Sequence, residues 1–167
     1  MKAIIVTDQA AGRTGMRLAE RPEPTAAIND VIVQIHASGF VPDELTWPST
    51  WTDRRGRNRT PSIPGHELAG VVTSLGYGTT GLSVGQRVFG LADWHRDGTL
   101  AEYIAIEARN LAPLPGDVDF TGGASLPISG LTRVAGTVPA RPPSSRAECP
   151  RARRGRCSRN DGDATRT

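Results

Sequence analysis

The amino-acid composition of the chain changes sharply after Thr132, and this change limits what the chain can fold into. Residues 133–167 contain no Leu, Ile, Met, Phe, Tyr or Trp, but they carry nine arginines, both cysteines and only three acidic residues. A segment of low hydrophobicity and high net charge cannot bury enough apolar surface to form a core. We therefore expect one core-forming unit over residues 1–132, followed by a disordered Arg/Pro-rich basic tail over residues 133–167.

The charge of the core-forming unit differs from that of the whole chain. The formal net charge of the chain is +3, yet residues 1–132 carry 11 basic and 14 acidic side chains. No apolar run approaches the roughly 20 residues that span a bilayer, and the N-terminal apolar stretch is too short for a secretory signal peptide. These features argue against transmembrane and secreted proteins, and they predict a cytoplasmic protein with no membrane partner.

Short apolar runs separated by turns predict a mainly β unit with little helix, of the sandwich or barrel type. Asp30–Ala37 and Thr99–Glu107 alternate along the chain as half-buried strands do. Further strands are expected at Lys2–Thr7, Leu68–Leu75 and Gln86–Leu91. One helix is expected to begin after an N-cap at Asp119 and to be made irregular by Pro127 and Gly130.

The stretch 39–62 is predicted to be a long loop, a kind of segment that is usually functional or mobile. It contains Trp47 and Trp51, for which two roles are open: core residues at one end of a barrel, or walls of an apolar substrate pocket. It also contains four arginines, which we interpret as a solvated charged turn: Arg54, Arg55, Arg57 and Arg59.

The basic tail allows a second interpretation, because clustered arginines neutralise the phosphates of nucleic acids. No aromatic residue is interleaved for base stacking, so only weak, salt-sensitive binding would follow. Cys149 and Cys157 have no histidine nearby, and their spacing does not predict a zinc site. We expect no specific nucleic-acid partner.

Three stretches, in this order, resemble the medium-chain dehydrogenase/reductase superfamily. They are Pro64–Val72 (PGHELAGVV), Gly81–Gly90 (GLSVGQRVFG), and Gly98–Tyr103 (GTLAEY) followed by Leu126-Pro127 and Gly130-Leu131-Thr132. The resemblance implies that residues 1–132 form the family's catalytic domain, a partly open GroES-like β-barrel that closes over a separate α/β Rossmann domain. It also implies an oxidoreductase that uses NAD or NADP, a small-molecule substrate in the cleft between the domains, and a homodimer.

The resemblance also indicates whether the chain has the ligands of a zinc site. Zinc enzymes of the family use three protein ligands, the first of which is a cysteine after a Ser-Gly-x pattern. Here Ser38-Gly39-Phe40 leads into Val41, which cannot bind metal, while His66 matches the second ligand. We expect no metal site, with His66 and Glu67 as hydrogen-bonding parts of a turn that enters a strand. A zinc-dependent alcohol dehydrogenase relative that uses His66 is the alternative.

The expected enzyme is therefore related to the zinc-independent quinone oxidoreductases and enoyl reductases, and it reduces a quinone, enone or carbonyl compound. The candidate cofactor-binding residues, along the nicotinamide and its ribose, are Gly39, Phe40, Val41 and Thr132. The candidate catalytic residues are Asp43, Trp47, His66 and Glu67. Asp43 has two possible roles, a proton-transfer acid or a loop acid bonded to backbone, and Trp47 is expected to wall the substrate.

After Thr132 the family continues with a helix and then a Rossmann strand, whereas this chain turns to arginine, proline and serine. Codons compatible with the residues from Arg133 onward, shifted by one base, spell an apolar helical pattern, a strand V-L-V-H and the turn G-A-A-G-A-V-G. Such a turn lets a pyrophosphate approach a helix N-terminus. The hypothesis is a frameshift that removes the cofactor domain and leaves the chain as written inactive. A non-catalytic barrel module with a basic nucleic-acid-binding arm is the alternative.

Overall fold

The computed structural model describes residues 1–137, and residues 138–167 of the predicted tail lie outside this range. A small sheet pairs β1 (Lys2–Ile5) with β2 (Arg17–Glu20), and a larger sheet has the strand order β6-β3-β4-β5-β7. The larger sheet consists of β3 (Asp30–Gly39), β4 (Glu67–Leu75), β5 (Arg87–Leu91), β6 (Tyr103–Glu107) and β7 (Leu111–Pro113). All neighbouring strands are antiparallel, and the edge strands β6 and β7 do not pair with each other. This open, mainly β architecture confirms the predicted fold class.

Two strands, β2 and β7, were not expected from the sequence. Each is short and lacks a run of alternating apolar residues, so its conformation depends on its partner. β2 lies antiparallel to β1, with Ala19 opposite Ala3, and β7 extends the large sheet beside β5. The expected strand at Thr99–Glu107 begins only at Tyr103, and Ala101 before it forms an isolated bridge to Ala3.

The main core lies on one face of the large sheet. It follows the predicted alternation of the strands, and its buried members are Val31, Val33, Leu68, Val72, Val88, Ala92, Ile104 and Ile106. Burying a Val, Leu or Ile side chain fully stabilises a fold by about 1.5–3 kcal/mol. Because the cluster draws on β3, β4, β5 and β6, it ties together the strands that carry the candidate site.

Beyond Gly39, which ends β3, the stretch 39–62 contains no named strand, but it is ordered by two short helices, η2 (Pro42–Thr46) and α1 (Pro48–Trp51). Each begins with a proline, which suits the first helical position because it has no N–H to leave unpaired. Trp51 is 8% exposed, packs with Val6 and Leu45, and donates its Nε1–H to the Leu45 carbonyl at 2.9 Å. Of the two roles open for Trp51, the structure supports the core role.

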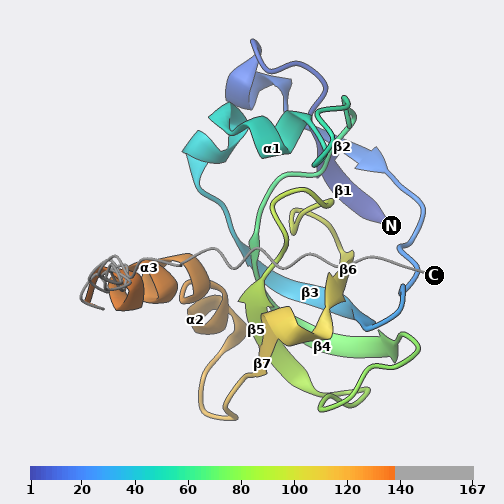
Figure 1. Ribbon diagram of the computed structural model, residues 1–167, viewed down its shortest axis with the longest axis vertical. Coiled ribbons are helices and arrows are strands. Elements are labelled where there is room, and N and C mark those ends of the chain that lie inside the picture. Colours follow the sequence, from blue (N-terminus) through green and yellow to red (C-terminus); the bar gives the residue numbers. More distant parts are fainter. Residues whose placement is uncertain (138–167) are drawn as a thin grey trace, which may run out of the picture.

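The other helices are η1 (Gly12–Gly15), η3 (Ala108–Asn110), α2 (Phe120–Ala124) and α3 (Pro127–Thr137). Asp119 is the N-cap of α2, as expected, and accepts the Gly122 N–H. The single irregular helix expected from the sequence is two helices, because Pro127 begins a new one. Helix α3 continues past Thr132, and α2 and α3 extend to one side of the large sheet (Figure 1). No helix within residues 1–137 is long and apolar enough to cross a membrane.

Candidate active site

A buried carboxylate, Glu44, lies at the centre of the site. Its side chain has no solvent exposure, and its Oε1 accepts the Val41 N–H at 3.1 Å. Its Oε2 accepts the Gly65 N–H at 3.0 Å. Glu44 is the third residue of η2, a position from which a glutamate commonly reaches back to the backbone at the helix start. The Glu44 carboxylate therefore joins η2 to the turn that enters β4.

His66 is the third partner of this carboxylate. Its Nδ1 lies 2.8 Å from Glu44 Oε2, and the histidine is 3% exposed. Because Glu44 accepts backbone N–H groups through both oxygens, the hydrogen-bond network places the hydrogen on Nδ1 of the ring. The other nitrogen, Nε2, then holds a lone pair in the neutral ring and a second hydrogen in the protonated ring.

The Nε2 atom of His66 has no hydrogen-bond partner among the described residues. In the same part of the chain, no fully buried side-chain nitrogen or oxygen lacks a partner. The Nε2 atom therefore keeps some contact with solvent although the rest of the ring is buried. The imidazole is thus oriented by Glu44 on one side and chemically available on the other.

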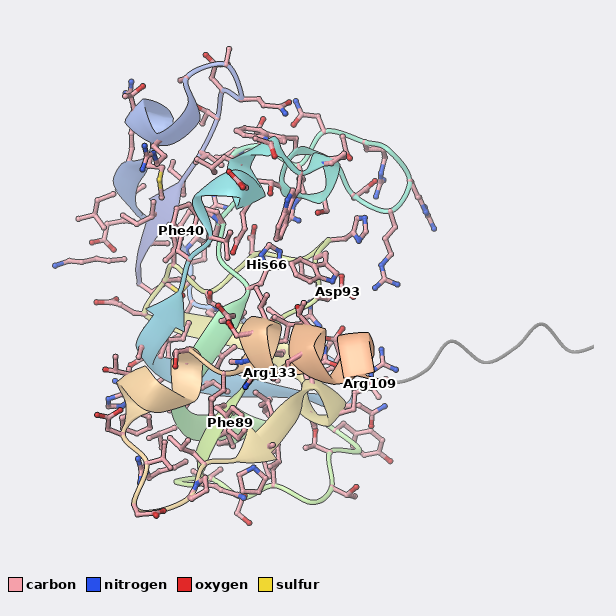
Figure 2. All side chains as sticks on the ribbon, turned by 90° about the vertical axis from the view of Figure 1, so that its left-hand side faces the viewer. Phe40, His66, Phe89, Asp93, Arg109 and Arg133 are labelled. Carbon is pink, nitrogen blue, oxygen red and sulfur yellow. The ribbon has the colours of Figure 1, made fainter. Side chains whose placement is uncertain are left out.

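Two indole rings pack around His66 and form with it an aromatic box of Trp47, His66 and Trp94. The ring centroid of His66 lies 4.3 Å from that of Trp94 and 5.7 Å from that of Trp47. The two indoles meet edge to face with their centroids 5.0 Å apart, a favoured aromatic geometry. Trp94 is 36% exposed, so part of its surface faces solvent. His66 lies between the short helices that follow Phe40 and helix α3 (Figure 2).

The loop that carries Trp94 is anchored by Arg96. The guanidinium bonds both carboxylate oxygens of the buried Asp30, at 3.1 and 2.7 Å, and also lies 2.9 Å from Glu107 Oε1. Hydrogen bonding and charge attraction from Arg96 lower the pKa of the Asp30 carboxyl, and the burial of Asp30 opposes this effect only in part. The carboxylate of Asp30 is therefore ionised at neutral pH and holds the loop in place.

Glu67 follows His66 in sequence but serves a different part of the site. Its Oε1 accepts the Ile128 N–H at 2.7 Å, in the first turn of α3, where a negative charge is favoured by the helix dipole. Gly39 lies opposite Glu67 in the ladder between β3 and β4. A Cβ atom at Gly39 would lie 2.9 Å from the Glu67 Cβ and 3.1 Å from the Ala124 carbonyl oxygen. The absence of a side chain at Gly39 thus lets Glu67 and α2 approach β3.

The model of the alcohol dehydrogenase GroES-like domain family matches residues 27–116, more than half of the chain. The chain belongs to this family. It is thereby a member of the medium-chain dehydrogenase/reductase superfamily, as the sequence resemblance implied.

The GroES-like domain is similar to several longer proteins. An L-threonine 3-dehydrogenase from Ruegeria pomeroyi is 29% identical over 75% of this chain and 43% of its own length. The solved quinone oxidoreductase from Coxiella burnetii is 27% identical, with a TM-score of 0.72 over 81% of this chain and 43% of that one. A mycobacterial protein solved as a complex with NADPH is also 27% identical, with a TM-score of 0.72 over 85% and 42%. The chain thus spans less than half the length of these relatives.

The GroES-like domain brings together some of the residues expected from the sequence and separates others. Trp47 and His66 meet in the aromatic box, and Gly39 meets Glu67 beneath α2. Three further candidates lie elsewhere: the Phe40 side chain packs on the core cluster around Trp51, Asp43 is exposed, and Thr132 is exposed on α3. Val41 is joined to the site through its backbone N–H.

Glu44 and Trp94 were missed by the sequence analysis. The signal for Glu44 was its position three residues after Val41 at a helix start. Trp94 gave no local signal, because it reaches His66 only through the pairing of β5 with β4. One interpretation needs correction: Arg59 does not belong to a solvated turn, since its side chain is 11% exposed and bonds the Ser49 carbonyl and Asp97.

The Gly39→Ala substitution should lower the free energy of unfolding by about 1–3 kcal/mol, the usual effect of an overpacked methyl group. The reason is the collision of the new Cβ with Glu67 and with the Ala124 carbonyl. Urea-induced unfolding followed by tryptophan fluorescence measures the change. Gly116→Ala is the matched control, because a Cβ there meets nothing within 4 Å. Equal unfolding midpoints for the two variants would contradict the close packing.

Proposed function

We propose that this GroES-like domain is the substrate-binding part of an NAD(P)H-dependent oxidoreductase that reduces a quinone, enone or carbonyl compound. The observation that carries the proposal is the aromatic box, in which the partly exposed Trp94 is backed by the buried pair His66–Glu44. Planar conjugated carbonyl compounds stack well on indole faces. Small-molecule sites typically combine such aromatic walls with a few fixed polar groups.

The residues of the domain orient the substrate and supply a proton. NAD(P)H, when bound, supplies the hydride. Trp94 and Trp47 hold the planar acceptor, and His66 supports Trp94 by packing against it. The protonated His66 can donate its Nε2 hydrogen to the oxygen of the carbonyl group as it is reduced. Glu44 keeps the imidazole in the required orientation, as a buried carboxylate does beside a catalytic histidine.

We propose that the residues of this domain contact only the nicotinamide end of the cofactor. The candidates for the nicotinamide and its ribose remain Gly39, Phe40, Val41 and Thr132; Thr132 is exposed on α3, whereas the Val41 N–H is already bonded to Glu44. Gly76–Gly81 has the spacing G-x-G-x-x-G, but it links the antiparallel strands β4 and β5. No helix follows this turn, and a pyrophosphate site of that type needs one. The rest of the cofactor would need a dinucleotide-binding domain.

We also propose that the reaction does not use zinc. What supports this is the donor set: Val41 stands where a cysteine ligand would be required, and the Nδ1 of His66 is engaged by Glu44. Within residues 1–137, no group of three His, Cys, Asp or Glu side chains is placed to hold a metal ion. A catalytic zinc needs three such ligands. Elemental analysis of the purified protein tests the proposal, and stoichiometric zinc would overturn it.

The Trp94→Ala substitution should weaken binding of the quinone menadione about tenfold, because an aromatic contact contributes about 0.5–1.5 kcal/mol beyond its buried area. Isothermal titration calorimetry on the full chain, without cofactor, measures the affinity. Tyr77→Ala is the control, since Tyr77 is 87% exposed and lies in the turn after β4. Equal affinities of Trp94→Ala and the unmodified chain would argue against the aromatic box as the substrate site.

The frameshift after Thr132 remains a proposal, supported by the composition of residues 133–167 and by the shifted codons. Resequencing the gene tests it directly, and DNA that encodes the tail in frame would reject it. The frame-restored protein should bind NADPH and oxidise it with menadione, whereas the chain as written should do neither. NADPH fluorescence and absorbance measure the two activities. The homodimer and the cytoplasmic location likewise stay predictions.

A further inference from the structure

An apolar groove begins at the aromatic box and runs between α3 and the strands β5 and β7. It has a volume of about 580 Å³, within the range of roughly 300–1,000 Å³ typical of small-molecule sites. Its apolar lining includes Phe89, Leu91, Ala92, Trp94, Leu111 and Leu131. Trp94 belongs to both the groove and the aromatic box, so a ligand stacked on Trp94 can continue into the groove.

Beside the groove lies a basin of charged side chains with a volume of about 500 Å³. The basin is lined by Arg54, Arg55, Arg57, His95, Arg96 and Arg109 together with Asp53, Asp93 and Glu107. Asp93 and Arg109 line both hollows, so the groove and the basin are adjacent. Both residues lie on the same side of the molecule, near the far end of α3 (Figure 2).

The carboxylates of the basin are each occupied by an arginine of the same basin. Asp53 lies 2.6 Å from Arg57, Glu107 lies 2.9 Å from Arg96, and Asp93 pairs with Arg54. Burial by itself would raise the pKa of Asp93, but the His95 N–H and the charge of Arg54 together lower it. The three acidic groups are therefore not available to neutralise further arginines.

Two guanidinium groups of the basin are not paired with these carboxylates. The exposed side chains of Arg55 and Arg109 form no hydrogen bond or ion pair with any residue of the described range 1–137. A guanidinium presents a planar set of donors that matches a carboxylate or a phosphate, and it stays charged at any physiological pH. An apolar groove that ends beside uncommitted guanidinium groups is complementary to a molecule that is apolar along its length and anionic at one end.

We propose that the groove and the basin together bind an amphipathic anion, in which an apolar chain or ring system carries a carboxylate or a phosphate at its far end. The apolar part lies along the groove from Trp94 toward Leu131, and the anionic group binds Arg109 with support from Arg55. This inference rests on the proposed function, because it names the class of substrate that the same site would take.

Calorimetric titration of the full chain with octanoate, octyl phosphate and 1-octanol, without cofactor, tests the inference. At least one of the two anions should bind tenfold or more tightly than the alcohol of the same chain length. The better of the two identifies a carboxylate or a phosphate as the natural group. Binding of 1-octanol as tight as that of both anions, or no binding of any of the three, would overturn the inference.

Single substitutions test where the anionic group of the ligand binds. Arg109→Gln should bring the affinity for the preferred anion down to that of 1-octanol, Arg55→Gln should have a smaller effect, and Arg17→Gln, on the exposed side of β2, should have none. Leu131→Asn should weaken octanoate and 1-octanol alike, because it acts on the groove. An unchanged affinity of Arg109→Gln would reject the assignment of the basin.

The test of anion binding and the test of the proposed reductase can fail independently of each other. Failure of the frame-restored protein to oxidise NADPH with any enone, quinone or carbonyl compound would reject the reductase. Anion binding that depends on Arg109 would in that case still establish the ligand site, and it would reject only the statement that the ligand is a reductase substrate.

Discussion

Replacement of Glu44→Ala should lower the free energy of unfolding by about 3–5 kcal/mol, the cost of removing one partner from a buried charged network. The substitution leaves three donors without an acceptor: the N–H groups of Val41 and Gly65 and the Nδ1–H of His66. It also opens a cavity where the side chain had no solvent exposure, and cavities add to the loss. Urea-induced unfolding followed by tryptophan fluorescence should show a much lower midpoint.

Asp43 provides a matched control one residue away. It lies in the same helix η2, but it is exposed, so Asp43→Ala should change the free energy of unfolding by less than about 0.5 kcal/mol. Glu44→Gln should fall between the two, because the amide keeps the volume but turns an NH₂ group toward one of the donors. Similar midpoints for Glu44→Ala and Asp43→Ala would show that the carboxylate does not organise the site.

Asp43 and Glu44 also show how much of the candidate site could be predicted from the sequence. The resemblance to the dehydrogenase family pointed to Asp43, since family motifs assign roles by position along the chain. The decision between Asp43 and Glu44 depends on which side chain η2 turns inward, and this is set by the packing of Leu45 and Trp51 below the helix. The helix itself was not predicted, so its inward face could not be assigned either.

The fold could be predicted more fully than the site, because apolar residues alternate along the sequences of the main strands. The alternating residues of β3 predicted a strand over Asp30–Ala37, two residues shorter than the strand observed, and placed Val31 and Val33 on one face, where both are fully buried. β2 and β7 have no such pattern, and they are strands only because β1 and β5 provide a paired backbone. Trp94 is a similar case: the Ala92 N–H donates to the His66 carbonyl at 2.7 Å, which brings the segment after β5 beside the histidine.

Removal of Arg96 should have the second largest effect on stability. Arg96→Gln leaves the buried Asp30 without its two charged hydrogen bonds and separates the loop from Glu107. A fully buried pair loses about 3–5 kcal/mol when one partner is removed. Because the Arg96 side chain is 33% exposed, we expect a smaller loss of about 2–3 kcal/mol, in line with solvent screening. Arg96→Lys keeps the charge without the planar fork and should recover only part of the loss.

The effect of Arg96→Gln should also depend on pH. Hydrogen bonding to Arg96 lowers the pKa of Asp30 in the folded protein, relative to about 3.9 in an unfolded chain. The resulting stability is complete above the unfolded value and is lost as the pH falls through the lowered folded value. The difference in stability between the unmodified chain and Arg96→Gln should therefore be largest near neutral pH and shrink below about pH 4. Urea midpoints from pH 7 to pH 2 measure it.

The same substitution separates a positioning role from a purely structural one. Within residues 1–137, Arg96 forms no cation–π contact with a ring of the aromatic box, but it fixes the loop that carries Trp94. Arg96→Gln should therefore weaken menadione binding, even at a temperature at which the variant is fully folded, and Arg96→Lys should restore part of that binding. Arg13→Gln, on an exposed helix far from this loop along the chain, should alter neither the pH dependence nor the binding. A stability difference that stays constant with pH would refute the role of the Asp30–Arg96 pair.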